Sequence, residues 1–249
     1  MALVTGPALI LQTYSYSETS KILRLLTQHH GVQSVIAKGA LRPKSRFGGV
    51  LEPFTEGNAS FNLREVRDLH TLSGFELTRS RQPLGLDLVR FGGASLVAEL
   101  VLRVGIQESD PDLFGSICLA LDAIERAPPA QLESTVLAVS WSLVALLGFA
   151  PALHCCLVCE RPLDQHDEVL FDYTAGGVRC ISCGTGLGGR PLPPAARSAL
   201  QQLVNGEVAI LDRTAAHWRL LDRFLAHHVL DGQTLHSITF LMGTVRGDK

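Results

Sequence analysis

Residues 58–63 and 69–77 read NASFNL and LHTLSGFEL, and these two segments decide the fold class of the N-terminal part. In the first segment, the apolar side chains of Phe61 and Leu63 alternate with short polar ones. In the second, Leu69, Thr71 and Ser73 alternate with residues of different character. A period of two is typical of β-strands, and turn-forming residues stand beside both segments. We therefore predict two adjacent strands here.

Other short segments of residues 1–80 fit the same pattern. We expect further strands at Ala8–Tyr14, Val32–Ala37 and Gly49–Phe54, each bounded by Gly, Pro, Asn or Asp. The segment Lys21–Thr27 fits a helix as well as a strand that is buried on both sides, and we leave both alternatives open. Five or six short strands in 80 residues favour a small β-barrel over a sandwich, which needs about seven strands in about 100 residues.

The periodicity becomes helical after Pro83. Apolar residues recur at helical spacing in five segments, namely Leu86–Val104, 111–127, Leu132–Phe149, Pro193–Val204 and Thr214–Leu230. Between the third and the fourth lies a segment rich in Gly and Cys. We therefore predict a mixed α and β protein with a β-barrel domain at 1–80. A helical domain follows at 81–249, and an insertion interrupts it at about 150–190.

The uncharged stretch Ser134–Leu153 is the most apolar part of the chain. Its continuous helical part would be about 24 Å long, shorter than the hydrocarbon core of about 30 Å. We expect this stretch to be the buried central helix of a globular domain. Residues 1–8 have neither the charged start nor the apolar core of a secretion signal, so we expect none.

The insertion contains two Cys-x-x-Cys pairs with a spacing typical of zinc sites. Two cysteines on one tight turn direct both sulfurs to one point, and two such turns supply a tetrahedron. Because four thiolates leave no open coordination position, we expect one structural Zn²⁺ rather than a catalytic one. Residues 169–173 and 176–179 are expected to form the hairpin between the pairs. The predicted ligands are Cys156, Cys159, Cys180 and Cys183, with Cys155 left open as a substitute for Cys156.

Other interpretations of the glycines and cysteines are weaker. Disulfides are not expected without a secretion signal, and a thioredoxin-like redox motif lacks its βαβ context. Cys118 lies on a helix face and is expected in the core. The run from Gly184 to Gly189 matches GxGxxG, but it follows a cysteine pair and leads into Pro191. We interpret it as a loop and not as a dinucleotide site.

The charge is unevenly distributed. The 249 residues contain 22 Lys and Arg and 24 Asp and Glu, and a net charge of −2 alone argues against a nucleic-acid partner. However, residues 1–80 hold nine basic and six acidic residues, and Thr19–Leu51 holds six basic residues and no acidic one. A solvated charged face is the simpler explanation, but a basic segment with Gly and Pro after a strand also suits a mobile phosphate-binding loop. The candidate DNA contacts are Lys21, Arg24, Lys38, Arg42, Lys44 and Arg46.

Catalytic patterns are not found in the sequence. There is no GxSxG, HExxH or phosphate-binding G-x4-GK[ST] motif, and the carboxylates show no acid–base pairing. The pairs His29–His30 and His227–His228 are adjacent in sequence, and neighbouring residues do not share a face. We therefore expect a protein that is not an enzyme.

The ordered set of segments resembles the RecO family of bacterial recombination mediator proteins. The resemblance rests on Leu9-Ile10-Leu11, on residues 17–23 (SETSKIL), on Lys38-Gly39, on Leu51-Glu52-Pro53-Phe54, and on the cysteine pairs after a helical block. It covers nearly the whole chain in order. It implies an OB-fold in the N-terminal domain and a zinc finger inserted in the helical one.

The resemblance also implies a function. Members of this family bind single- and double-stranded DNA, anneal complementary strands and, with RecR, help the RecA recombinase replace single-strand-binding protein. The expected location is the cytoplasm, at the nucleoid. An alternative from another class is a protein-docking adaptor, in which the barrel and the finger bind proteins rather than DNA. Whether the finger touches DNA is left open.

Overall fold

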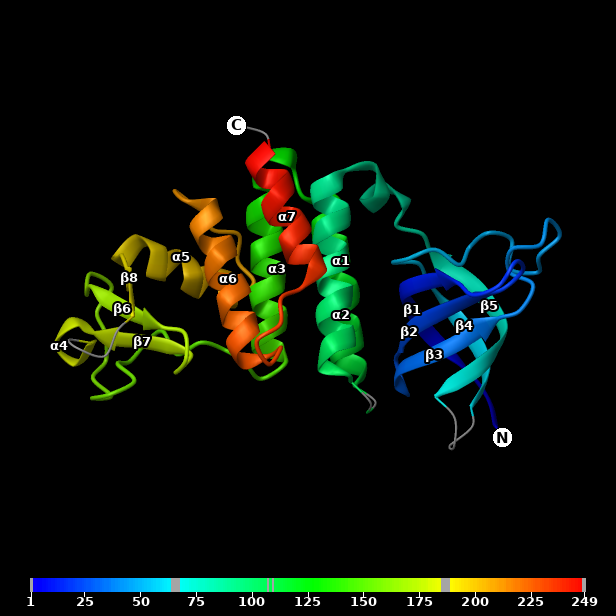
Figure 1. Cartoon of the computed structure of the whole chain (residues 1–249), viewed down its shortest axis with the longest axis horizontal. Helices are drawn as coiled ribbons and strands as arrows, with labels where there is room; N and C mark the ends of the chain where they lie inside the picture. Colours follow the sequence, from blue (N-terminus) through cyan, green and yellow to red (C-terminus); the bar gives the residue numbers. More distant parts are fainter. Residues whose placement is uncertain (1, 64–67, 107, 109, 185–188, 248–249) are drawn as a thin grey trace. The chain divides into compact units, whose positions relative to one another are not determined.

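The computed structural model describes residues 2–63, 68–106, 108, 110–184 and 189–247 (Figure 1). Its internal contacts divide the chain into two units. The first consists of residues 1–87 with 97–125, and the second of 88–96 with 126–249. The first unit therefore contains helical residues in addition to its strands.

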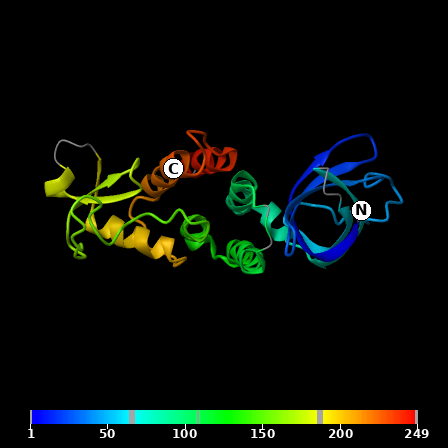
Figure 2. The same ribbon diagram turned by 90° about the horizontal axis from the view of Figure 1, so that it is seen from below.

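Five strands of the first unit form a closed barrel, which is seen as a ring in Figure 2. The strands are β1 (Ala2–Ser15), β2 (Lys21–Thr27), β3 (Gly31–Ala37), β4 (Glu56–Leu63) and β5 (Leu69–Arg79). Around the ring the order is β1-β2-β3-β5-β4, and β4 pairs with β1. All pairings are antiparallel except β3 with β5, where Ser34 lies opposite Leu69. This is the arrangement of an OB-like barrel, and it resolves Lys21–Thr27 as a strand.

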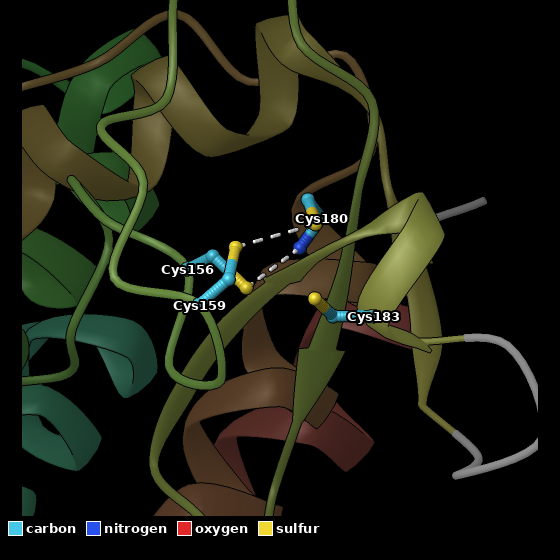
Figure 3. A group of neighbouring side chains, drawn as sticks. All are labelled: Cys156, Cys159, Cys180 and Cys183. Carbon is cyan, nitrogen blue, oxygen red and sulfur yellow. Dashed lines mark hydrogen bonds between the residues drawn. The ribbon is translucent and has the colours of Figure 1, made fainter.

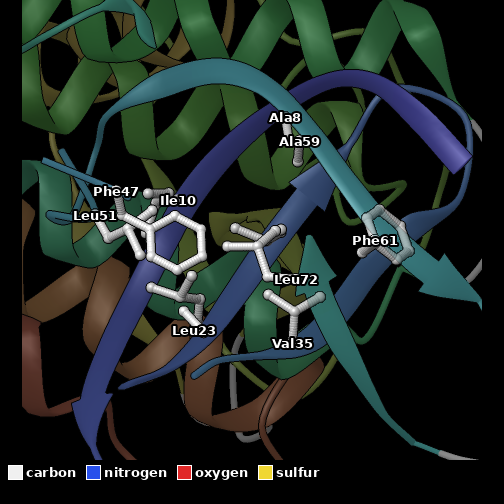
Figure 4. Close-up of a cluster of buried hydrophobic side chains, with 11 residues drawn as sticks. Ala8, Ile10, Leu23, Val35, Phe47, Leu51, Ala59, Phe61 and Leu72 are labelled. Carbon is white, nitrogen blue, oxygen red and sulfur yellow. The ribbon is translucent and has the colours of Figure 1, made fainter. Parts of the chain in front are cut away.

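The barrel core combines strand residues with two residues from the segment between β3 and β4 (Figure 4). Ile10, Leu23 and Leu72 are fully buried, and Phe47 and Leu51 pack against them. The predicted strand Gly49–Phe54 is wrong, because these residues form turns and irregular backbone. Their apolar pattern reflects burial at the end of the barrel and not pairing in the sheet.

A buried ion-pair network connects β5 to α2 (Pro111–Arg126) within the first unit. The Arg81 guanidinium, 1% exposed, donates to Asp122 through Nε at 3.0 Å and Nη2 at 2.8 Å. It also donates to the carbonyl oxygen of Phe54 at 3.0 Å and pairs with Glu56. Asp122 accepts a further bond of 2.6 Å from Arg79. The Asp122 carboxylate on α2 thus binds both Arg79 and Arg81 at the end of β5.

The helices lie mostly in the second unit. The helical elements are η1 (Gln82–Leu86), α1 (Leu88–Val104), α2, η2 (Pro129–Gln131), α3 (Leu132–Leu146), α4 (Ile181–Gly184), α5 (Pro194–Val204), α6 (Thr214–His228) and α7 (His236–Gly247). As predicted, α3 is the buried central helix. It ends before Phe149, because Gly148 has a φ of 90° and turns the chain. The sequence pattern did not predict α7.

Close packing in the second unit depends on a glycine of α1. A Cβ atom on Gly93 would lie 2.6 Å from a methyl group of Val136 on α3, so only glycine allows this approach. The ring of Trp141 on α3 packs against that of Phe224 on α6 with a centroid distance of 5.1 Å and a tilt of 57°, and both side chains are buried. In the described part of the chain, no helix is both long enough and apolar enough to cross a membrane.

Candidate functional site

The four predicted metal ligands come together beside a small sheet within the second unit (Figure 3). The sheet consists of β6 (Val169–Asp172), β7 (Gly177–Cys180) and β8 (Arg190–Leu192), in the order β7-β6-β8. Cys156 and Cys159 lie on a turn before the sheet, Cys180 ends β7, and Cys183 lies on α4. The hairpin expected between the pairs is therefore confirmed, and we call residues 152–192 the finger.

The sulfur positions fit a tetrahedral metal site. All four Sγ atoms lie within 4.8 Å of one another, and those of Cys159 and Cys180 are 3.9 Å apart. Tetrahedral coordination with Zn–S bonds of about 2.3 Å places sulfurs about 3.8 Å apart. A disulfide needs about 2.05 Å, and all the cysteines are free thiols. The cluster therefore suits a closed, structural metal site.

The backbone prepares the first cysteine for metal binding. Burial raises the pKa of the Cys156 thiol, but backbone N–H groups of Cys159, Cys180 and Val158 outweigh this effect and lower it to about 6. The N–H of Cys180 lies 3.4 Å from the Cys156 sulfur. In contrast, hydrogen bonds with the neighbouring sulfurs, led by Cys180, raise the pKa of Cys183 to about 12. Without a cation the cluster does not hold four thiolates, so metal binding would release protons.

The turn after the first pair contains an unusual residue. Glu160 has a φ of 57°, a left-handed conformation that glycine adopts at lower cost. Its N–H donates to the carbonyl oxygen of Cys156 at 2.9 Å, which closes the turn. Cys155 is exposed and lies outside the four-sulfur group, so the geometry favours Cys156 as the first ligand.

Four of the six candidate DNA contacts lie on one folded segment between β3 and β4. Lys38, Arg42, Lys44 and Arg46 are all exposed. Successive turns shape this segment, and the N–H of Leu41 donates to the carbonyl oxygen of Thr19 at 3.0 Å. Its far end is fixed by the buried Phe47. We call residues 38–46 the basic segment.

The guanidinium of Arg46 connects the basic segment to the barrel. It donates to the carbonyl oxygen of Leu72 at 3.1 Å and lies 4.9 Å from the centre of the Phe47 ring. The segment is therefore anchored at both ends and does not leave the barrel as a free loop. Its charges still face solvent, where phosphates could reach them.

The other two candidates are less accessible. The ammonium group of Lys21 pairs with Glu52 at 2.9 Å, and its side chain is 17% exposed. Arg24, in the middle of β2, is half-buried, and its Nε atom is buried without a hydrogen-bond partner. The structure does not bring these two residues into the basic segment. The sequence did not show that Lys21 is paired, because its partner Glu52 is distant in the chain.

A further concave site in the second unit was not predicted from the sequence. A pocket of about 610 Å³ lies between α6, the start of α5 and the finger. Arginines from three separate segments line it. Arg219 and Arg223 are four residues apart on α6, a spacing that predicts a shared face, but nearby acidic residues conceal their charge in any sequence average.

Both parts of this architecture match known protein families. Residues 1–81 match the family described as "Recombination protein O N terminal", and residues 85–236 match "Recombination protein O C terminal". The chain belongs to the RecO family. A protein named DNA repair protein RecO from Nocardioides sp. is 31% identical over 236 residues, which cover 90% of this chain and 94% of the relative. A relative with the same name from Anaeromyxobacter dehalogenans is 33% identical over 84% of this chain and 81% of its own length.

Family membership agrees with the observed architecture. The expected RecO resemblance is confirmed, and so is the mixed fold with an OB-like barrel, a helical part and a four-cysteine cluster. The RecO family is a family of DNA repair proteins, which agrees with the basic segment as the candidate DNA interface.

Proposed function

We propose that this RecO family member is a non-enzymatic mediator of DNA repair. It binds single- and double-stranded DNA, anneals complementary strands and, with RecR, helps the RecA recombinase replace single-strand-binding protein. The observation that carries the proposal is the exposed basic segment on an OB-like barrel. No catalytic motif accompanies it in the sequence. Acting on chromosomal DNA, the protein would work in the cytoplasm, at the nucleoid.

The basic segment suits phosphate contacts better than base recognition. Three of its four cationic side chains form no hydrogen bond or ion pair in the described residues, and the fourth, Arg46, bonds only to a carbonyl oxygen. Cations of this kind bind the backbone of any sequence and release counterions. The binding energy would therefore depend on salt and not on base order, as annealing of arbitrary complementary strands requires.

A strand-annealing assay with a salt titration tests the proposal. If four phosphates are neutralised on a single strand, log K should fall against log salt with a slope of about −2.8 from this segment. Replacing Lys38, Arg42, Lys44 and Arg46 together by Ala should remove that part of the slope and slow annealing. Lys21→Ala is the matched control, because Glu52 already neutralises Lys21, and it should change the slope by less than one phosphate contact.

The assay also separates the proposal from a docking adaptor. An adaptor would not accelerate the annealing of complementary oligonucleotides, and its binding partners would be proteins only. If the variant with all four replacements accelerates strand annealing as much as the wild type does, the role given to the basic segment is wrong. Failure of the wild-type chain to accelerate annealing at any salt concentration would refute the DNA function.

We further propose that the cysteine cluster holds one structural Zn²⁺. Support comes from the four free sulfurs within 4.8 Å and from the closed donor set. The bound metal would neutralise the thiolates and fix the turn at Cys156 and Cys159 to β7. Metal analysis of the purified protein should give about one equivalent of zinc. Less than about half an equivalent, with unchanged thermal unfolding after chelation, would refute the assignment.

A further inference from the structure

The pocket beside the finger combines an apolar interior with a charged rim. Its volume of about 610 Å³ falls within the range of ligand-binding pockets. Phe171 of β6, Leu192 of β8 and Leu220 of α6 line its interior, and all three side chains are buried. Small alanines on α5 and α6 complete the lining and leave the space open. The interior therefore suits an apolar group.

Four arginines surround this interior. Arg190 comes from β8, Arg213 precedes α6, and Arg219 and Arg223 lie on α6. All four are exposed, and none forms an ion pair with another described residue. Among the described residues of the lining, Asp212 is the one acidic residue, and Asp222 stands next to Arg223 on α6. Residues 81–249 carry a net charge of −5, so this rim concentrates positive charge on an otherwise acidic part of the chain.

A stacking platform lies at the edge of the pocket. The guanidinium carbon of Arg223 is 5.5 Å from the centre of the Tyr173 ring, and the His227 ring stacks on Tyr173 with a centroid distance of 6.4 Å. A base would therefore stack on the outer face of this Arg223–Tyr173–His227 group. The Tyr173 ring itself is half-buried and held edge-on against Phe171 at 5.3 Å. Nucleic-acid bases stack on aromatic rings and on guanidinium planes of this kind. A ligand that carries only carboxylates would bind the arginines, but it would gain no binding energy from the Tyr173 ring.

His217 is a buried histidine in the wall of the pocket. Its side chain lines the pocket and is 6% exposed, and its Nδ1 atom has no hydrogen-bond partner. Burial lowers the pKa of His217, so the imidazole is neutral and can donate or accept one hydrogen bond. Buried polar atoms in native proteins almost always have a partner. Nδ1 itself has no accessible surface, so a bound group would contact another edge of the ring.

We propose that this pocket is a second contact site for single-stranded DNA. One base enters the interior beside Tyr173 and His217, and the adjoining phosphates bind the rim arginines. The site rests on the proposed DNA function and extends it to the finger, which supplies Arg190 and Tyr173. With the basic segment it gives one chain two separate DNA contacts, as annealing of two strands requires.

Photocrosslinking of the full-length protein tests the site directly. An oligothymidylate that carries 5-iodouracil should form an adduct with a peptide that contains Tyr173 or His217. The adduct should persist when the four basic-segment residues are replaced by Ala. It should disappear in the variant Arg213→Ala, Arg219→Ala, Arg223→Ala, whose salt slope should also fall by about 2.

One further variant and two controls separate an effect on binding from an effect on stability. Tyr173→Leu should weaken oligothymidylate binding about tenfold through the loss of base stacking. Phe240→Leu removes an exposed aromatic ring from α7 that does not line the pocket, and should leave binding unchanged. Arg161→Ala removes an exposed arginine of the finger outside the pocket and serves as the charge control, with metal analysis to check it because Arg161 also interacts with Cys180. Far-UV circular dichroism should show native spectra for all of them.

The possible outcomes show whether the pocket proposal fails alone or together with the proposed DNA function. Adducts confined to residues 1–80, with normal annealing, would overturn the pocket and leave the DNA function intact. The absence of any DNA binding would remove both. If the triple arginine variant binds DNA normally but loses a fluorescent acidic peptide that the wild type binds, the pocket is a peptide site and the proposal is wrong.

Discussion

The two arginines at the end of β5 should differ sharply in their contribution to stability. Arg81→Met removes a guanidinium that is 1% exposed and leaves Glu56 and the Phe54 carbonyl oxygen without it. Arg79→Met removes a guanidinium that is 33% exposed from the same carboxylate of Asp122. Methionine keeps an unbranched apolar side chain in both cases. The pair of variants therefore compares a buried and a solvated partner of one acid.

The magnitudes follow from burial. Removing one partner of a buried ion pair costs about 3–5 kcal/mol, and we expect about 3 kcal/mol for Arg81→Met because Arg79 still neutralises Asp122. Solvent screens the pairs of Arg79, so Arg79→Met should cost about 1 kcal/mol or less. In equilibrium terms the two changes correspond to factors of about 100 and about 5.

Native-state hydrogen exchange of the barrel measures this difference locally. Exchange of peptides from β2 and β3 should accelerate more than about 100-fold in Arg81→Met and about fivefold in Arg79→Met. Tryptophan fluorescence is unsuitable, since Trp141 and Trp218 both lie in the second unit. Equal acceleration in the two variants would refute the argument that burial makes Arg81 the dominant partner.

Three further changes should have measurable effects. Chelation should lower the midpoint of thermal unfolding, and Cys180→Ser should abolish this response while Cys155→Ser, outside the cluster, retains it. Gly57→Ala should destabilise the barrel by about 1–3 kcal/mol in urea unfolding, because its Cβ would lie 2.5 Å from a ring of the neighbouring strand. Gly85→Ala, which meets nothing within 4 Å, should stay within about 0.5 kcal/mol, and an equal cost for both would contradict the clash. Because burial lowers the pKa of His217, the unfolded state binds more protons below the usual value of 6.5. Stability should therefore fall as the pH drops through that value, and a His217→Gln variant with the same pH dependence would disprove this origin.

Local patterns predicted most of the strands and helices because their side chains follow the period of the element. Strict alternation at Phe61 and the cysteine spacing from Cys156 to Cys183 are properties of neighbouring residues, and both were confirmed. The segment Gly49–Phe54 was wrong for a physical reason. Burial of Leu51 comes from its place over the barrel end, and a local pattern cannot distinguish this from burial in a sheet.

The candidate sites show the same limit. The ion pair between Lys21 and Glu52 joins residues 31 positions apart, so the sequence could not show that this lysine is neutralised. The arginine pocket likewise assembles side chains from the finger and from α6, which only the folded chain brings together. Metal ligands were easier to predict, because each pair of cysteines needs only its own turn.

The parallel pairing of β3 with β5 has a consequence for synthesis of the chain. The ring closes only when Leu69–Thr71 reach Ser34–Ile36, so the barrel cannot be completed until β5 has left the ribosome. Until then, β3 and β4 each carry an unpaired edge rich in backbone donors and acceptors. Fragments that end before Leu69 should therefore aggregate, whereas those that include Arg79 contain every strand of the ring. The order of synthesis thus makes the last strand the one that covers both open edges of the ring.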